Sequence, residues 1–168
     1  RGNAMALLRY PRFRFRPSQS DALHLDFWLD ADNILRDAGT YSYNTNAQWL
    51  NYFSGTTSHN TIEFDGRDQM PRISRFLMGG WLKTNKLLAL REDGLTTLFG
   101  AGYRDNRGAR HFRDIRFRND SMHISDEIDG FSHKAVLRWR LMPGNWLLEF
   151  TPEGPRVRLQ GEKNVSLS

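Results

Sequence analysis

The chain has 168 residues, no cysteine and a formal net charge of +5, with arginine far more frequent than lysine. This length is enough for one domain with its own hydrophobic core, and the lack of cysteine excludes disulfide frameworks, thiolate metal sites and thiol catalysis. Arginine binds the oxygens of carboxylate, sulfate or phosphate groups in pairs. The partner is therefore an acidic polysaccharide or a nucleic acid, unless the arginines only solvate sheet faces.

The sequence carries no sign of membrane insertion. No segment approaches the ~18 consecutive apolar residues that a membrane-spanning helix needs, and no apolar block typical of a signal peptide follows the N-terminus. Residue 1 is arginine rather than an initiator methionine, so we expect the chain to be a piece of a longer protein. The lack of a targeting signal therefore does not assign the parent protein to a compartment.

In the first half of the chain, alternating apolar and polar residues predict short β-strands. The stretch RYPRFRFRP (9–17) alternates aromatic residues with arginines, which we interpret as a strand with its aromatic side chains inward. The stretches ALHLDFWLDADN (22–33) and NTIEFDG (60–66) show the same alternation, the second ending in an Asp-Gly turn signal. Helical character is limited to NAQWLNYF (46–53) and the first dozen residues.

The second half continues this pattern. WLKTNKLLALRE (81–92) and GLTTLFGAGY (94–103) supply further strands, and DIRFRNDSMHISDEIDG (114–130) is predicted to be a hairpin that turns at Asn119-Asp120. KAVLRWRLMPGNWLLEF (134–150) contains two strands around a Pro-Gly-Asn turn. Many short strands with such turns predict an all-β fold, an antiparallel β-sandwich that forms a single domain over residues 1–168.

A histidine stands at the start of one predicted strand. His59 precedes the alternation at Ile62, and upstream Asp37 precedes a loop that carries Tyr41 and Tyr43. If the strand that ends at Asp37 and the strand that begins after His59 are neighbours, the two side chains meet at one end of the sheet. The sequence therefore predicts a shared pocket for Asp37 and His59, close to one of the tyrosines.

Three kinds of site are compatible with these residues. An aspartate and a histidine can share a divalent metal ion, usually zinc. A tyrosine near arginines can take a proton from an acidic sugar, because a neighbouring positive charge favours the phenolate. Alternatively, His59 is a hydrogen-bonded structural residue and the tyrosines only pack. Spacing alone does not choose among these alternatives.

Two longer segments resemble a known family. LRDAGTYSYN (35–44) is similar to the Asp-x-Gly-x-Tyr segment of the heparinase II/III-like polysaccharide lyases. WLNYFSGTTSHNTIEFDGRDQ (49–69) resembles the Tyr-Phe, Thr-x-x-His-Asn-Thr, Asp-Gly and Gln signature of the same family. With Asp21-Ala22-Leu23 upstream, the resemblance spans roughly positions 15 to 75, and the later strands fit the C-terminal sandwich of the family by class.

The resemblance implies a fold and an activity. Members carry an N-terminal α/α toroid before the sandwich and cleave acidic, uronate-containing polysaccharides, among them glycosaminoglycans, by β-elimination. This chain lacks the toroid, so we expect it to be one wall of a cleft, inactive alone, within a parent protein that is periplasmic or secreted. The alternative is a module that binds or processes acidic glycans without catalysis, and whether the chain counts as an enzyme stays open. Nucleic acid becomes the less favoured partner, and no membrane contact is expected.

The resemblance also implies roles for individual residues. The predicted catalytic residues are Tyr43, His59 and Tyr41. The predicted substrate contacts are Trp49, Arg16 and Asn60.

A metal site is implied by the same comparison, with Asp37 and His59 as two of its ligands. Where the family has a His-x-His-x-Asp segment, this chain reads Pro-Ser-Gln-Ser-Asp (17–21), which makes Gln19 the third position. An amide oxygen is a poor zinc ligand and suits calcium or magnesium better. The alternatives are a divalent ion, zinc or calcium, and a hydrogen-bonded cluster without an ion, and we favour the cluster.

Overall fold

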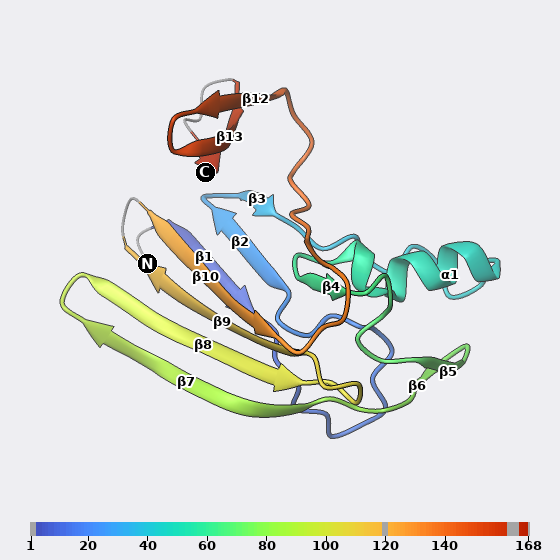
Figure 1. The fold of residues 1–168 in the computed structure, drawn as a ribbon. Helices are drawn as coiled ribbons and strands as arrows, with labels where there is room; N and C mark the ends of the chain where they lie inside the picture. The colour runs from blue at the N-terminus through green and yellow to red at the C-terminus, as the bar shows by residue number, and fades with distance from the viewer. Residues whose placement is uncertain (1–2, 119–120, 161–164, 168) are drawn as a thin grey trace.

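The computed structural model describes residues 3–118, 121–160 and 165–167, and most of them lie in antiparallel strands (Figure 1). The strands of the first half are β1 (Ala4–Leu8), β2 (Leu25–Leu29), β3 (Asp32–Leu35), β4 (Ile62–Phe64), β5 (Arg72–Ser74) and β6 (Leu77–Met78). The strands of the second half are β7 (Lys83–Asp93), β8 (Thr96–Arg104), β9 (Arg110–Phe117), β10 (Met122–Asp129), β11 (Ala135–Leu137), β12 (Trp146–Thr151), β13 (Gly154–Leu159) and β14 (Ser166–Leu167). The helices are α1 (Ala47–Ser54) and a 3-10 turn, η1 (Thr56–Ser58). No helix in these residues is long and apolar enough to cross a membrane.

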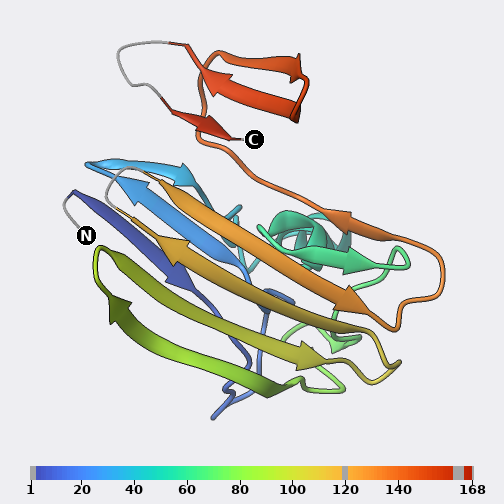
Figure 2. The same cartoon turned by 60° about the vertical axis from the view of Figure 1, so that its left-hand side comes forward.

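Two sheets pack face to face and form the main core. The first has the order β1-β2-β3 and the second the order β10-β9-β8-β7. Figure 2 shows the blue strands of the first sheet lying against the yellow and orange strands of the second. Ile115 and Phe117 of β9 meet Leu25, Leu35 and Ala4 of the first sheet in one buried cluster. Burial of these apolar side chains stabilises the sandwich, and the predicted antiparallel β-sandwich is confirmed.

The same inward face of β9 becomes polar toward its other end. Arg113 is fully buried, and its Nε and Nη2 donate to the two carboxylate oxygens of Asp126 on β10 at 2.7 and 2.9 Å. Its Nη1 donates to the backbone oxygens of Leu23 and Asn60 at 2.8 and 2.7 Å. Because a buried guanidinium must be paired to be tolerated, Arg113 ties the second sheet to the segments that precede β2 and β4.

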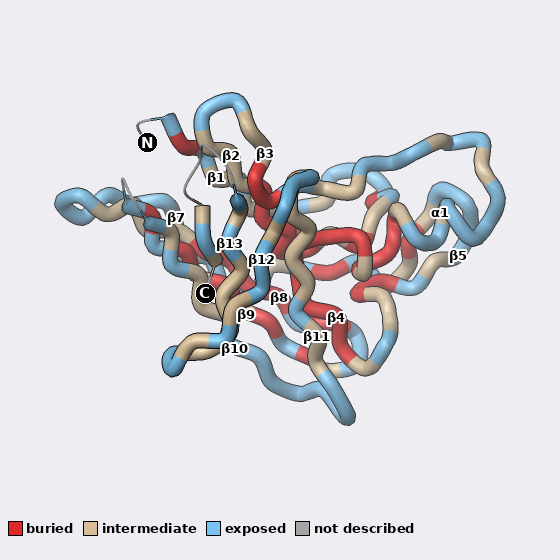
Figure 3. The backbone as a smooth tube through the Cα atoms, turned by 90° about the horizontal axis from the view of Figure 1, so that it is seen from above, coloured by how far each residue is buried: buried red, intermediate tan, exposed pale blue. Residues whose placement is uncertain are grey.

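Smaller sheets complete the structure. β4 pairs with β11, β5 with β6, and β12-β13-β14 form a separate three-stranded sheet at the top of Figure 1. A second buried cluster includes Met70, Met78 of β6 and Tyr103 of β8. Figure 3 shows buried segments in and around β3, β4, β8 and β9.

Several predicted elements are confirmed. The hairpin of 114–130 is β9 and β10, in which Ile115 pairs with Ile124, while its predicted turn at Asn119-Asp120 lies outside the described residues. The helix predicted over 46–53 is α1, and Asn46 caps it by accepting a hydrogen bond from the backbone nitrogen of Trp49 at 3.1 Å. Such a cap satisfies one of the free N–H groups of the first turn.

Other predictions are wrong. The first dozen residues contain β1 rather than a helix. The two strands predicted within 134–150 are nevertheless present as β11 and β12, on either side of the Pro-Gly-Asn turn, and they belong to different sheets. The expected strand at 9–17 is an irregular loop. Its alternation arises because Tyr10 and Phe13 pack on the core from a loop, while proline limits the hydrogen bonding that a strand needs.

Candidate functional site

The predicted convergence of Asp37 and His59 is present in the structure. Asp37 follows the end of β3, and His59 lies between η1 and β4 with an extended backbone. His59 Nδ1 lies 3.2 Å from Asp37 Oδ2. The side chain of His59 is fully buried, and that of Asp37 is 17% exposed, so the pair lies just beneath the surface.

A second histidine completes this pair. His24 lies immediately before β2, and its Nε2 is 3.6 Å from Asp37 Oδ2 and 3.3 Å from Asp26 Oδ2. The rings of His24 and His59 meet edge to face with centroids 5.4 Å apart. The backbone N–H of Asn60 donates to His24 Nδ1 at 2.8 Å, so Nε2 is the ring nitrogen that faces the carboxylates.

His24, rather than Gln19, occupies the expected third position. Gln19 lies in the loop before β2 and donates from Nε2 to Thr40 Oγ1 at 3.3 Å. The aspartate of the His-x-His-x-Asp pattern corresponds to Asp26, five residues after the expected Asp21. Aligned on Asp26, the segment 22–26 puts His24 in the second histidine position and alanine in the first. The signal that could have found His24 is its place two residues before an aspartate at the start of a strand.

One arginine, Arg9, contacts three carboxylates around this cluster. Arg9 Nη1 donates to Asp21 Oδ2 at 2.9 Å and to Asp37 Oδ2 at 3.2 Å, and Arg9 Nη2 lies 3.9 Å from Asp26 Oδ2. Burial alone would raise the pKa of Asp37, but the neighbouring His59 and the N–H of Gly39 outweigh burial and hold that pKa well below its usual range. Asp37 is therefore an anion at neutral pH.

The cluster of His24, Asp37 and His59 fits a divalent metal ion. One ligand atom from each residue lies within 4.8 Å of the others. The separations of 3.2 and 3.6 Å from Asp37 Oδ2 are close to the ~3.3 Å edge of a tetrahedron with bonds of ~2.0 Å. In the part of the chain that the structure describes, His24 Nε2 and both ring nitrogens of His59 make no aligned hydrogen bond.

The chemistry of these ligands selects among ions. Two imidazoles and one carboxylate suit zinc, whereas calcium prefers oxygen ligands. The hydrogen bond that His24 Nδ1 accepts puts the proton of the neutral ring on Nε2, so a metal ion there displaces that proton. His24 therefore puts an imidazole, rather than the amide of Gln19 that favoured a metal-free cluster, in the third position.

Asp37 also anchors the loop that carries the predicted catalytic tyrosines. Its Oδ1 accepts the N–H of Gly39 at 2.6 Å, and Gly39 and Tyr41 both have positive φ, 77° and 62°. A positive φ is uncommon for a residue with a side chain. Tyr41 and Tyr43 project from this loop with 69% and 70% of their surfaces exposed.

Aromatic side chains of α1 support the tyrosine loop. The ring of Tyr41 stacks on Phe53 with centroids 5.3 Å apart, and Trp49 lies 6.1 Å from Tyr41 with 43% of its surface exposed. Tyr52 on the same helix accepts a hydrogen bond from Arg140 Nη2 at 2.6 Å. Arg140 was not identified from the sequence, because its contact with Tyr52 joins residues far apart in the chain.

Two predicted site residues lie in the interior. Asn60 is fully buried, and its Nδ2 donates to the backbone oxygens of Leu25 and Arg36 at 2.9 and 3.3 Å. Its Oδ1 accepts the N–H of Arg140 at 2.5 Å. Asn60 therefore joins three segments of the protein rather than contacting substrate. His59 is only 1% exposed, so its ring does not reach the surface, and it lies against Asp37 instead.

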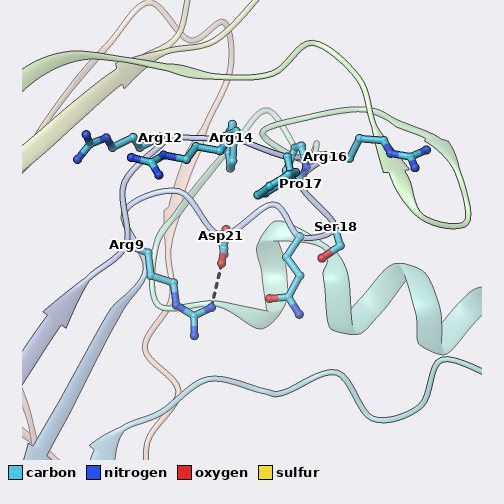
Figure 4. Close-up of a pocket in the computed structure, with 10 residues that line it drawn as sticks. Arg9, Arg12, Arg14, Arg16, Pro17, Ser18 and Asp21 are labelled. Atoms are coloured by element: carbon cyan, nitrogen blue, oxygen red, sulfur yellow. Dashed lines mark hydrogen bonds and ion pairs between the residues drawn. The ribbon is translucent and has the colours of Figure 1, made fainter.

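Arg16 lies with other arginines in an open groove of about 550 Å³ beside the cluster (Figure 4). The groove is formed by the loop before β2, and Arg9 and Asp21 belong to both the groove and the surroundings of Asp37. The predicted substrate contacts Arg16 and Trp49 are thus both exposed.

The sequence matches the family described as Heparinase II/III-like, C-terminal, over residues 9–166. No curated protein sequence matches it. The fold is similar to a heparinase III gene product with methylated lysines (TM-score 0.75, 18% identity), covering 97% of this chain and 24% of that one. It is also similar to the heparan sulfate lyase HepC from Pedobacter heparinus (TM-score 0.66, 17% identity), covering 88% and 22%. The chain thus spans about a quarter of the length of these structures.

Proposed function

Because the chain belongs to the heparinase II/III-like C-terminal family, we propose that it is the β-sandwich domain of a polysaccharide lyase that cleaves acidic glycans by β-elimination. An N-terminal α/α toroid in the parent chain is part of this proposal and supplies the opposite wall of the cleft. An extracellular polymer as substrate places the parent protein in the periplasm or outside the cell, and this location belongs to the proposal too.

The observation that carries the proposal is the anchoring of an exposed tyrosine loop by a buried charged cluster. Asp37 uses Oδ2 toward His24, His59 and Arg9, and uses Oδ1 to hold Gly39. The loop beyond Gly39 then presents its tyrosines to solvent. His24, Asp37 and His59 would hold a divalent ion, and its positive charge would fix these side chains. Preorganised side chains of this kind are typical of catalytic sites.

The proposed reaction needs two proton transfers. A base removes the proton from the carbon α to the uronate carboxylate, and the electrons of that C–H bond form the new carbon–carbon double bond. The bond from the neighbouring carbon to the bridging oxygen breaks, and an acid protonates that oxygen. Tyr43 and Tyr41 are the residues of this chain that we propose for these transfers, because a tyrosine takes one proton as the phenolate and gives one as the phenol.

A second function is favoured by the burial of His59. A histidine that cannot reach the surface leaves this chain without an imidazole base at its tyrosine loop. If the remainder of the parent protein supplies none, the protein binds or processes acidic glycans without cleaving them.

The test is incubation of the full-length protein with uronate polymers, followed by absorbance of the new double bond. We expect product from the wild type and a loss of about 10²-fold or more in rate for Tyr43→Phe or Tyr41→Phe. Tyr10→Phe, which changes a tyrosine outside the loop, should keep the wild-type rate. Glycan binding by a folded protein that forms no unsaturated product would favour the non-catalytic alternative.

A further inference from the structure

The loop before β2 forms a positively charged hollow next to the candidate site. We call it the arginine groove. Its lining residues of interest are Arg9, Arg12, Arg14, Arg16, Phe15 and Asp21. The lining thus contains four arginines and one aspartate, and Arg9 is already paired with that aspartate. The excess positive charge of the groove therefore comes from Arg12, Arg14 and Arg16.

These three arginines are available to a ligand. Each is exposed, and in the described residues none has a side-chain hydrogen bond or ion pair. Figure 4 shows Arg12 and Arg14 side by side, with Arg16 farther along the loop and reaching in the other direction. Phe15, between two of the arginines in sequence, is 85% exposed. A hollow with unpaired guanidinium groups and one exposed ring suits an anion attached to a larger molecule.

The loop that carries the arginines is fixed at both ends. At its start, the backbone nitrogen of Arg9 donates to the oxygen of His24 at 2.9 Å, and Thr84 Oγ1 donates to the oxygen of Pro11 at 2.7 Å. At its end, the N–H of Ser20 donates to the oxygen of Ser54 at 2.9 Å. Preorganisation lowers the entropy that a ligand must offset on binding, so these contacts favour a built site over solvated side chains.

The arginine groove is continuous with the cluster of His24, Asp37 and His59. Arg9 lines the groove and also donates to Asp37. Gln19, at the other end of the groove, donates to Thr40 in the tyrosine loop. The groove therefore borders both the cluster and the tyrosine loop.

We propose that the arginine groove binds an oxoanion of an acidic glycan, a carboxylate or a sulfate, on a sugar unit next to the one presented to the tyrosine loop. This inference rests on the proposed function, because it extends the same glycan beyond that loop. Arg12 and Arg14, which lie side by side (Figure 4), pair with the anionic oxygens, Arg16 adds positive charge farther along the loop, and Phe15 covers a sugar face. Groove binding makes the protein select polymers that carry anionic groups on neighbouring units.

A single-stranded nucleic acid is the competing ligand for a basic, aromatic loop. Such platforms stack successive bases on several exposed rings. In the arginine groove only Phe15 is strongly exposed, whereas Phe13 packs against the core and lies edge-on to Trp81 at 6.4 Å. The glycan is therefore favoured, and nucleic acid becomes an outcome of the test.

The experiment compares two triple variants of the full-length protein. The groove variant carries Arg12→Gln, Arg14→Gln and Arg16→Gln. The control variant carries Arg91→Gln, Arg116→Gln and Arg118→Gln. These changes remove the same charge from exposed arginines near the end of the second sheet that lies away from the groove. Binding of a sulfated uronate hexasaccharide, its unsulfated counterpart and a single-stranded oligonucleotide is measured by calorimetry at two salt concentrations, with circular dichroism to confirm folding.

We expect the groove variant to bind the hexasaccharides at least tenfold more weakly and the control variant to change less than threefold. If the groove variant loses more affinity for the sulfated hexasaccharide, the bound anion is a sulfate. If it loses more affinity for the unsulfated one, the bound anion is a carboxylate. Equal losses in both variants, or tighter binding of the oligonucleotide than of either hexasaccharide, would overturn the inference. If the groove variant does not fold, Arg14→Glu alone must give the same selective loss. A wild-type protein that binds through the groove but forms no unsaturated product supports the groove and contradicts the lyase proposal.

Discussion

His24 Nε2 lies 3.6 Å from Asp37 Oδ2, and both side chains lie beside His59. Because this spacing suits a tetrahedral ion, we predict that the purified protein retains about one zinc ion per chain after dialysis. His24→Ala removes one imidazole ligand and should lower the metal content to a small fraction of the wild-type value. Elemental analysis of the dialysed protein measures the outcome.

The matched control is Gln19→Ala. Gln19 contacts Thr40 instead of the cluster, so its removal should leave the metal content unchanged. A protein that loses its metal with Gln19→Ala and keeps it with His24→Ala would show that the third ligand has been assigned wrongly.

Asn60 is predicted to be a determinant of stability. Asn60→Ala leaves the oxygens of Leu25 and Arg36 and the N–H of Arg140 without their partner. Each unsatisfied buried group costs about 1 kcal/mol or more, so the free energy of unfolding should fall by about 2–4 kcal/mol. Urea denaturation measures this change. Asn51→Ala, on the exposed side of α1, should stay within about 0.5 kcal/mol of the wild type.

Acid should destabilise the protein through Asp126. Burial alone would raise the pKa of Asp126, but hydrogen bonds with His111 and Arg113 outweigh burial and lower that pKa to about 2. The unfolded chain binds the proton near the ordinary value of 3.8, so the stabilisation is complete above that pH and is lost as the pH falls toward 2. The shift corresponds to about 2 kcal/mol.

Urea denaturation between about pH 5 and about pH 2 tests this dependence, because this range spans the folded and unfolded pKa values of Asp126. Asp126→Asn should flatten the fall in unfolding free energy over this range. Glu127→Gln changes the next carboxylate of β10, whose side chain is 69% exposed, and should leave the wild-type slope in place. An unchanged slope in Asp126→Asn would mean that other carboxylates cause the acid sensitivity.

The parts of the fold that could be predicted from sequence are those set by local alternation. The hairpin of β9 and β10 follows from period-2 patterns on either side of a turn. The same pattern at 9–17 gave a wrong strand, because Tyr10 and Phe13 pack from a loop against a buried cluster of residues distant in the sequence, among them Met78 and Tyr103. Alternation reports which side chains are buried, and a strand also needs a partner for its backbone.

The candidate site was predicted only in part for a similar reason. Asp37 and His59 were found because each lies within a longer motif. His24 was missed because a short pattern can be aligned at more than one position, and only the structure shows which aspartate, Asp21 or Asp26, belongs to it. Arg113 and its backbone partner Leu23 are 90 residues apart, and local sequence patterns carry no signal for such a contact.

Trp49 is predicted to bind sugar on the proposed cleft. Its ring is 43% exposed on α1 and lies beside Tyr41, so it can stack on a sugar face. Trp49→Ala should weaken binding of an acidic hexasaccharide by about tenfold, ~1.4 kcal/mol, whereas Trp49→Phe keeps a ring and should lose less. Phe150→Ala removes an aromatic side chain that is 82% exposed on β12 and should not alter binding. Calorimetric titration of the three variants measures these differences, and equal affinity of Trp49→Ala and wild type would remove Trp49 from the binding surface.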